Sequence, residues 1–269
     1  MGLVGESSMI ITHNINWPSC LSKKLYPAIK QGWEDSKKPI HFFWGLGADL
    51  PKQIKEVAKR GEEWWYVDTG YVTKDIKRYP TPDILDYDNT YFRICRGGIH
   101  TTNMKPIKTL PSRSRYFLSQ KVFFKGWNNN ADGHILIAPS SETVTRFINK
   151  MTQEEWVENV VRRIKKITDR EIRFRNKPRP GNQWWNTDIK DDLKDAYCLV
   201  TNMSLSAIDA ILLGVPVICD KKHVARPISS PDINNLYKPD NVNVWLQQLG
   251  DNQFTLKEIK NGTAYECLK

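Results

Sequence analysis

An aspartate that directly follows an apolar run is the side chain of this sequence best placed to act as a base. Asp68 stands in 64-WWYVDTGY-71, where Gly70 permits a tight turn after the run. A carboxylate at the end of a strand can take the proton from a hydroxyl group that attacks another molecule. An aspartate that caps a turn has the same surroundings in sequence, so both roles stay open for Asp68.

Small polar residues separate two apolar patterns at 201-TNMSLSA-207, where a strand is expected to pass into a helix. Small side chains at this point let backbone amides at the start of the helix approach an anion such as a phosphate. The residues expected to contact that group are Asn202, Ser204 and Ser206.

Polar and basic residues follow two further apolar runs. Ser140 and Ser141 come after the run 134–139, and Arg173, Arg175 and Lys177 lie in 171-EIRFRNKP-178. We expect them to hold a departing diphosphate, because arginine makes paired contacts with phosphate oxygens. Arg173 and Arg175 share one face of a strand, and two arginines inside a sheet would need an anion or a carboxylate partner. A solvated position at the edge of a sheet is the alternative.

A formal net charge of +10 indicates a polyanionic partner such as nucleic acid. Basic residues alternate with aromatic ones between residues 101 and 133, a composition that suits phosphates and unstacked bases. The residues expected to contact such an acceptor are Tyr71, Arg93, Arg96, His100, Arg113, Arg115 and Lys125. An ordinary basic linker whose aromatic residues lie in a core is an equal alternative.

Predicted strands alternate with predicted helices along the chain, and most of the residues named above follow a strand. Strands are expected at 9–13, 40–45, 64–69, 90–95, 134–140, 171–176, 198–202 and 216–220. Helices are expected at 19–35, 49–61 and 152–168, and the last begins with a capping box of Thr152 and Glu155. This alternation predicts the α/β class, with parallel sheets in two doubly wound domains.

The alternation is lost between residues 101 and 133, which indicates a linker. We predict an N-terminal acceptor-binding domain at 1–128, a C-terminal donor-binding domain at 129–240 and terminal helices at 241–269. Because ligands bind beyond the carboxyl ends of parallel strands, the cleft between the two domains is the expected site.

The run 204-SLSAIDAILLGVPV-217 resembles the donor-site motif of GT-B glycosyltransferases, which have two Rossmann-like domains. The resemblance implies that the small polar residues and the start of the helix hold the pyrophosphate of a nucleotide-sugar. It also implies that Asp209, in the acidic position of the motif, bonds the ribose hydroxyls. An aspartate in the first turn of a helix also complements the helix dipole, so a structural role for Asp209 stays open.

Several other segments resemble bacteriophage glycosyltransferases that modify hydroxymethylated pyrimidines in DNA. These segments are 64-WWYVDTGY-71, 133-GHILIAPSS-141, 168-TDREIRFRNKP-178 and 245-WLQQLGDNQFTLKEIKNGTAY-265. The resemblance implies transfer of a sugar, with UDP-glucose the commonest donor of the family, to a hydroxymethylated cytosine or uracil in double-stranded DNA. It also implies that the terminal helices pack back across both domains.

Two other functions fit the same residues, namely a non-catalytic nucleic-acid-binding protein on a GT-B fold and a glycosyltransferase that acts on a surface polysaccharide. No DxD metal motif follows a predicted strand, so we expect no obligatory metal or cofactor beyond a UDP-sugar co-substrate. Five scattered cysteines indicate free thiols. Without an apolar run of membrane-spanning length or a signal peptide, we expect a cytoplasmic protein. The resemblance to bacteriophage enzymes implies the cytoplasm of an infected bacterium, and we expect the protein to be a monomer.

Overall fold

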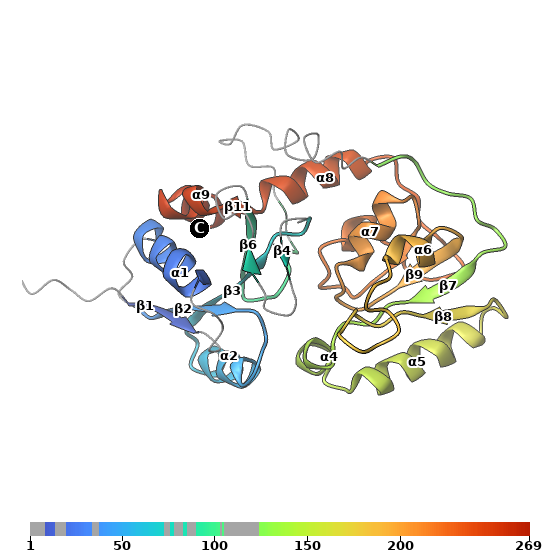
Figure 1. Ribbon diagram of the computed structural model, residues 1–269, viewed down its shortest axis with the longest axis horizontal. Coiled ribbons are helices and arrows are strands. Elements are labelled where there is room, and N and C mark those ends of the chain that lie inside the picture. Colours follow the sequence, from blue (N-terminus) through green and yellow to red (C-terminus); the bar gives the residue numbers. More distant parts are fainter. Residues whose placement is uncertain are drawn as a thin grey trace, which may run out of the picture. The chain divides into compact units, whose positions relative to one another are not determined.

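The computed structural model describes residues 9–13, 20–33, 38–72, 76–77, 83–84, 90–102, 104 and 124–269. The chain forms two compact units (Figure 1). Unit 1 comprises Met1–Thr101 and Asn252–Lys269, and unit 2 comprises Thr102–Asp251. The chain therefore completes unit 2 before its last residues return to unit 1. The boundaries expected after residues 128 and 240 stay predictions.

Unit 1 is built on a five-stranded sheet with the order β1-β2-β3-β6-β11. Its strands are β1 (Ile10–His13), β2 (Ile40–Trp44), β3 (Glu63–Thr69), β6 (Tyr91–Arg96) and β11 (Phe254–Thr255). The first three run parallel, whereas β6 and β11 are antiparallel to their neighbours. A parallel neighbour needs a crossover, usually a helix, and the sequence has a helical pattern before β2 and β3 but none before β6.

Every residue of β2 is buried, because helices cover both faces of this sheet. They are α1 (Cys20–Gly32), α2 (Leu50–Lys59), α9 (Leu256–Lys260) and α10 (Thr263–Leu268). The apolar side of α2 buries Leu50, Ile54 and Val57 at helical spacing. The C-terminal α9 packs against α1, where a Cβ on Gly32 would lie 1.7 Å from the carbonyl oxygen of Ile259. Glycine at this position therefore permits the close contact.

Two very short strands, β4 (Ile76–Lys77) and β5 (Asp83–Ile84), pair with each other in antiparallel fashion. They lie between β3 and β6 in the sequence. Neither these strands nor β11 was predicted, because their residues do not belong to an apolar run, whereas the equally short β10 lies in the run 216-PVICD-220.

Unit 2 is built on a four-stranded sheet with the order β10-β9-β7-β8, in which all strands are parallel. The strands are β7 (His134–Ile137), β8 (Ile172–Phe174), β9 (Ala196–Val200) and β10 (Val217–Ile218). Every strand expected from the sequence is therefore confirmed, with bounds that differ by a few residues. The edge position of β8 corresponds to the solvated alternative left open for Arg173, whereas Arg175 lies just beyond the strand and is buried.

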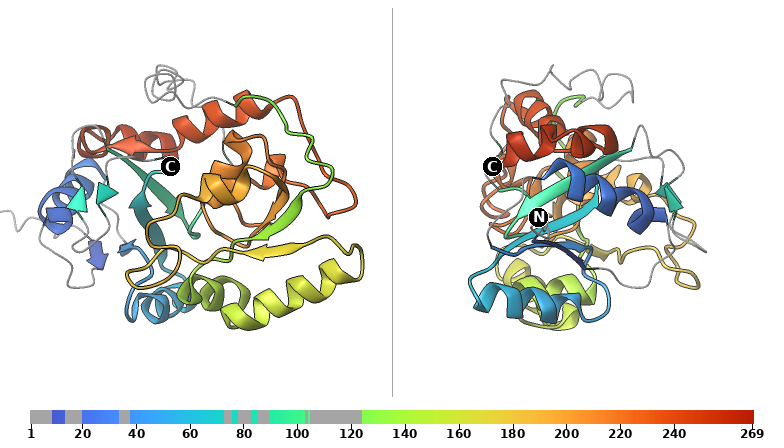
Figure 2. Two further views of the ribbon diagram at one scale, coloured as in Figure 1. Left: turned by 45° about the vertical axis from the view of Figure 1, so that its right-hand side comes forward. Right: turned by 90° about the vertical axis from the view of Figure 1, so that its left-hand side faces the viewer.

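The helices of unit 2 lie on both faces of its sheet (Figure 2). One face carries α4 (Glu142–Asn149) and α5 (Gln153–Lys165), and the other carries α6 (Ile189–Leu193) and α7 (Ser206–Leu212). The 3-10 helix η1 (Arg226–Ile228) and α8 (Val242–Asp251) follow. The capping box of Thr152 and Glu155 at the start of α5 is confirmed.

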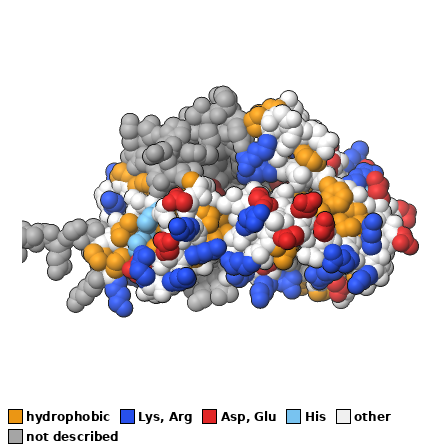
Figure 3. All heavy atoms as spheres, turned by 90° about the horizontal axis from the view of Figure 1, so that it is seen from below, with side chains coloured by type: hydrophobic (Ala, Val, Ile, Leu, Met, Phe, Trp, Pro, Cys, Tyr) orange, Lys and Arg blue, Asp and Glu red, His pale blue; other side chains and the backbone are white. Residues whose placement is uncertain are grey.

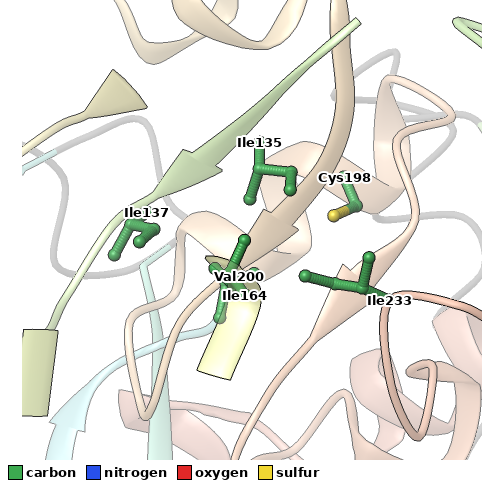
Figure 4. Packing of buried hydrophobic residues seen from close by; sticks show 6 residues of the cluster. All are labelled: Ile135, Ile137, Ile164, Cys198, Val200 and Ile233. Atoms are coloured by element: carbon green, nitrogen blue, oxygen red, sulfur yellow. The ribbon is translucent and has the colours of Figure 1, made fainter. Parts of the chain in front are cut away.

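The core of unit 2 joins β7 and β9 to α5. Its buried members are Ile135, Ile137, Ile164, Cys198, Val200 and Ile233 (Figure 4). Burial of the five aliphatic side chains among them stabilises this layer by ~1.5–3 kcal/mol each. The packing holds the parallel strands in register, so their carboxyl ends lie at one edge of the sheet.

The described cysteines Cys95, Cys198, Cys219 and Cys267 are free thiols, and the first three are buried. Burial raises the pKa of the Cys198 thiol to about 12 and that of Cys219 to about 11. Among the residues that the structure describes, no helix has the length and apolar character needed to cross a membrane.

Candidate functional site

Polar residues after β7 and β9 are joined by hydrogen bonds at the carboxyl edge of the unit 2 sheet. The backbone amide of Ser140 donates to Oδ1 of Asn202 over 2.8 Å, and the amide of Met203 donates to the Ser140 hydroxyl over 3.1 Å. The Thr201 hydroxyl donates to the carbonyl of Ala138 over 2.6 Å. The loops that follow the two central strands are therefore fixed to each other.

Asn202 is the centre of this cluster and is only 1% exposed. Its Nδ2 donates to the Thr145 hydroxyl over 3.1 Å and to Oδ1 of Asn149 over 2.9 Å, both on α4. Asn149 Nδ2 in turn donates to Oδ2 of Asp220, which follows β10, over 3.1 Å. One buried amide thus connects the ends of three parallel strands.

Three members of the cluster were missed by the sequence interpretation, namely Thr145, Asn149 and Asp220. Asp220 ends the predicted strand 216–220, so the rule that selected the other residues after strands would also have selected it. Thr145 and Asn149 lie four residues apart on α4, which puts both on one side of that helix. The α4 helix was not predicted, so this spacing gave no signal.

In the turn before α7, the hydroxyl groups form hydrogen bonds with other groups of the same turn. The Ser206 amide and hydroxyl both donate to the Ser204 hydroxyl, over 3.3 and 2.9 Å, and the Ser204 amide donates to the Thr201 hydroxyl over 3.3 Å. A phosphate at this turn would therefore replace existing hydrogen bonds of Ser204 and Ser206. Asp209 lies exposed in the first turn of α7, where its charge also complements the helix dipole.

Ser140 and Ser141 differ in their surroundings. Ser140 is buried within the cluster, whereas Ser141 is partly exposed at the N-cap position of α4 and makes no capping hydrogen bond through its side chain. Of the two, Ser141 is therefore the hydroxyl more accessible to a ligand.

The two arginines around β8 lie in opposite environments. Arg173 is 52% exposed and forms two hydrogen bonds of 2.8 Å to the carboxylate of Glu171. Arg175 is 4% exposed, pairs with Asp192 and donates to the hydroxyl and carbonyl of Thr187 over 3.0 and 2.8 Å. Each arginine therefore has a carboxylate partner. The exposed Lys177 lies just beyond them.

In unit 1, Asp68 is held by an ion pair with a buried arginine. Its Oδ2 accepts hydrogen bonds from the Tyr66 hydroxyl over 2.6 Å and from Nη2 of Arg93 over 2.8 Å. Its Oδ1 accepts from the backbone amide of Thr69 over 2.7 Å. Arg93 also donates from Nη1 to the carbonyl of Thr69 over 3.1 Å and lies over the ring of Tyr71.

This environment favours the charged form of Arg93. Burial lowers the pKa of Arg93, but the Asp68 carboxylate, together with Tyr66, Tyr71 and Cys95, raises that pKa above its usual value. Burial, and then the Asp68 charge, raises the pKa of Tyr66 well above its usual value, so its hydroxyl stays protonated as a donor. Both carboxylate oxygens of Asp68 thus accept hydrogen bonds from neighbouring residues of unit 1. The geometry therefore favours the turn-stabilising alternative for Asp68.

The residues expected to contact an acceptor do not form one basic surface in the described part of the chain. Tyr71, Arg93 and His100 are buried, and Nη2 of the exposed Arg96 pairs with Glu63 over 2.7 Å. Lys125 is exposed, and Arg113 and Arg115 lie outside the described residues. On the face drawn in Figure 3, basic side chains are interspersed with acidic ones.

Two histidines of unit 1 form a stacked pair that the sequence interpretation passed over. His13 ends β1, and its Nε2 lies 2.8 Å from Nδ1 of His41 on β2. Gln53 Oε1 lies 2.9 Å from Nδ1 of His13, and Oε2 of Glu62 lies 3.0 Å from Nε2 of His41. The ring of His13 also stacks on Phe43, with 4.2 Å between centroids. The pairing of β1 with β2 brings the two rings together.

Burial lowers the pKa of both histidines. For His13 the charge of His41 lowers it further, while the hydrogen bond with Gln53 raises it. For His41 the nearby Glu62 carboxylate raises the pKa without outweighing burial. Arg60 lowers both values, and Asp49 raises that of His13. Within the described residues, no group of three or more metal-ligating side chains is present, so this pair is not part of such a group.

Comparison with known proteins gives a likeness in structure only. No family model matches the chain, and no curated protein matches its sequence. A solved structure of Thermosulfurimonas dismutans KpsC, titled beta Kdo 2,4 transferase, has a TM-score of 0.50 and 11% identity. That match covers 91% of this chain and 90% of the other. A second, titled beta Kdo 2,7 transferase, has a TM-score of 0.49 and 11% identity, with coverage of 96% and 99%.

The likeness at a TM-score of 0.50 confirms the predicted fold class. The chain has an α/β fold with two sheets rich in parallel strands, consistent with a two-domain GT-B-like fold. At 11% identity the match supports the fold and nothing finer. The assignment of individual donor and acceptor residues therefore stays a prediction.

Substitution of the two arginines near β8 should have very different effects on stability. We expect Arg175→Met to lower the free energy of unfolding of unit 2 by about 2 kcal/mol, because the buried charge-assisted hydrogen bonds of the guanidinium with Asp192 and Thr187 would be lost. Arg173→Met should change it by less than about 1 kcal/mol, because its pair with Glu171 is exposed. Urea denaturation measures both. Equal losses would contradict the assigned environments.

The histidine pair should make unit 1 less stable in acid. An unfolded chain takes up protons near the ordinary histidine pKa of about 6.5, whereas the folded pair resists protonation. The contribution of the two neutral histidines to the stability of unit 1 is therefore complete above that pH. It is lost as the pH falls toward the lowered pKa values that the histidines have in the folded protein. Hydrogen exchange of β1 and β2 at pH 7 and pH 5 should show a larger acid effect in the wild type than in His41→Asn. The same acid effect in both proteins would exclude the pair as its source.

Proposed function

We propose that this protein is a glycosyltransferase that moves a sugar from a nucleotide-sugar to a saccharide acceptor. The observation that carries the proposal is the polar cluster around Asn202, which lies at the carboxyl edge of a parallel sheet in a GT-B-like fold. Ligands of open α/β sheets bind at this edge. The cluster holds Ser141, Ser204 and Ser206 on loops of defined shape, which suits contacts with a phosphorylated donor.

The donor sugar is proposed from the fold likeness. The structure with a TM-score of 0.50 is titled a beta Kdo 2,4 transferase, which makes Kdo a candidate sugar for this chain. In the transfer step, the bond between the sugar's anomeric carbon and the phosphate oxygen breaks while the acceptor oxygen forms the new bond. The acceptor's proton passes to a base, and the phosphate leaves with the bonding electrons.

A modified pyrimidine in DNA is the second candidate acceptor, because a net charge of +10 favours a polyanion. Neither of the two KpsC titles names DNA. Tyr71, Arg93 and His100, which were expected to contact DNA, are buried in unit 1. These observations favour a saccharide acceptor, and a carboxylated saccharide would also match the positive charge.

The proposal is tested by offering the protein several donors and several acceptors. Donors are UDP-glucose and a nucleotide-activated Kdo, and acceptors are a panel of oligosaccharides, hydroxymethylcytosine DNA, hydroxymethyluracil DNA and unmodified DNA. We expect the mass of one sugar to be added to an oligosaccharide. If, after digestion of the DNA, mass is added only to a modified nucleoside, the acceptor is DNA and not a saccharide. No transfer with any pair, although donor binds, would favour a binding protein.

Asp68→Asn decides between the two roles of that residue. We expect the melting temperature to fall, because the buried Arg93 loses its charged partner, while the folded protein keeps its turnover within about tenfold. Rate, donor affinity and melting should be measured on one sample. Glu63→Gln is the matched control, because it removes the partner of the exposed Arg96 and should change stability by less than about 1 kcal/mol. A ~10²–10⁴-fold fall in turnover with unchanged affinity would assign Asp68 as the base.

A further inference from the structure

His223 lies in the segment after β10 and is completely buried. Its Nδ1 accepts a hydrogen bond from the backbone amide of Ala225 over 2.9 Å. A backbone amide can only donate, so Nδ1 carries no proton in this arrangement. The proton is therefore on Nε2, which lies 3.0 Å from the carbonyl oxygen of Ser204 and donates to it. The two contacts define both the tautomer and the neutral state of the ring.

The carbonyl that His223 contacts belongs to the turn before α7. Ser204 accepts two hydrogen bonds from Ser206 through its own hydroxyl, and its carbonyl also accepts from the amide of Ala207 over 3.2 Å. Ser204 thus organises the hydroxyl groups of the turn through its side chain and the start of the helix through its carbonyl. His223 adds a donor from outside the turn.

The segment that carries His223 is itself fixed to the same loop. The amide of Asp220 donates to the carbonyl of Asn202 over 3.2 Å, and the amide of His223 donates to the carbonyl of Asp220 over 2.9 Å. The amide of Arg226 then donates to the carbonyl of His223 over 3.0 Å. The segment after β10 is therefore anchored to the loop after β9 at two points, through Asn202 and through Ser204.

We infer that His223 is a positioning residue for the phosphate group of the donor. It holds the backbone of Ser204, and with it the turn before α7, in place at the edge of the sheet where a phosphorylated ligand would bind. The inference rests on the proposed function. Loss of the imidazole donor would leave the Ser204 carbonyl with one donor fewer and the backbone of the turn less well fixed, so donor binding should weaken before any chemical step.

Two substitutions separate the two hydrogen bonds of the ring. The Asn side chain of His223→Asn places an oxygen near the position of Nδ1, so it can accept from the Ala225 amide but cannot reach the Ser204 carbonyl. The longer Gln side chain of His223→Gln places an amide nitrogen near the position of Nε2, so it can donate to that carbonyl. The first variant keeps the local turn and loses the positioning contact, whereas the second does the reverse.

Titration calorimetry with UDP-glucose and with nucleotide-activated Kdo gives the binding result. For whichever donor binds the wild type, we expect about tenfold weaker binding by His223→Asn and a change of less than about threefold for His223→Gln. In a transfer assay, KM for the donor should rise in His223→Asn while kcat stays near its wild-type value. Wild-type affinity in His223→Asn, or equal losses in both variants, would overturn the inference.

Hydrogen exchange gives a second result that needs no ligand. The amides of Ser206 and Ala207 should exchange several-fold faster in His223→Asn than in the wild type or in His223→Gln. Faster exchange together with a wild type that binds neither donor would contradict the proposed function, and the positioning contact would stand. Binding by the wild type together with unchanged exchange and affinity in His223→Asn would contradict only the role of His223.

Discussion

The buried amide of Asn202 is the interaction on which the candidate site depends. A polar group taken out of water needs hydrogen-bond partners, because an unmet donor or acceptor costs about 1–3 kcal/mol. Asn202 meets this requirement with the Ser140 amide, Thr145 and Asn149, which come from two different elements. Satisfying one side chain therefore fixes the loop after β7, the helix α4 and, through Asn149, the residue Asp220 after β10. The shape of the edge follows from this one constraint.

The same reasoning explains why residues suited to bind anions are occupied by their own neighbours. Arg175 is buried against Asp192 and Thr187, and Arg93 is buried against Asp68. A buried guanidinium needs a carboxylate or several acceptors, and the fold supplies them from within each unit. Basic residue types in a sequence consequently say little about ligand binding until burial is known.

Charge and fold together restrict the function without specifying the substrate. The positive net charge is compatible with any polyanion, and basic and acidic side chains are mixed on the face drawn in Figure 3. A GT-B-like fold accommodates many sugar donors and acceptors, because specificity lies in loops at the edges of the sheets. Asn202 and His223 hold the loops at the carboxyl edge of the unit 2 sheet in place through hydrogen bonds.

The sequence by itself determined the α/β class, the eight strands that lie in apolar runs and the capped helix α5, because each depends on a local pattern of apolar residues or on a cap. It also selected Asn202, Ser140 and the 204–206 turn as residues that follow strands. Tertiary structure alone decided that β8 is an edge strand, that Asp68 pairs with Arg93, and that His223 contacts Ser204. These facts depend on which strands are neighbours and on which side chains become buried together. Residues 19 to 25 positions apart in the chain come into contact only once the sheets have formed, so no local sequence pattern predicts these contacts.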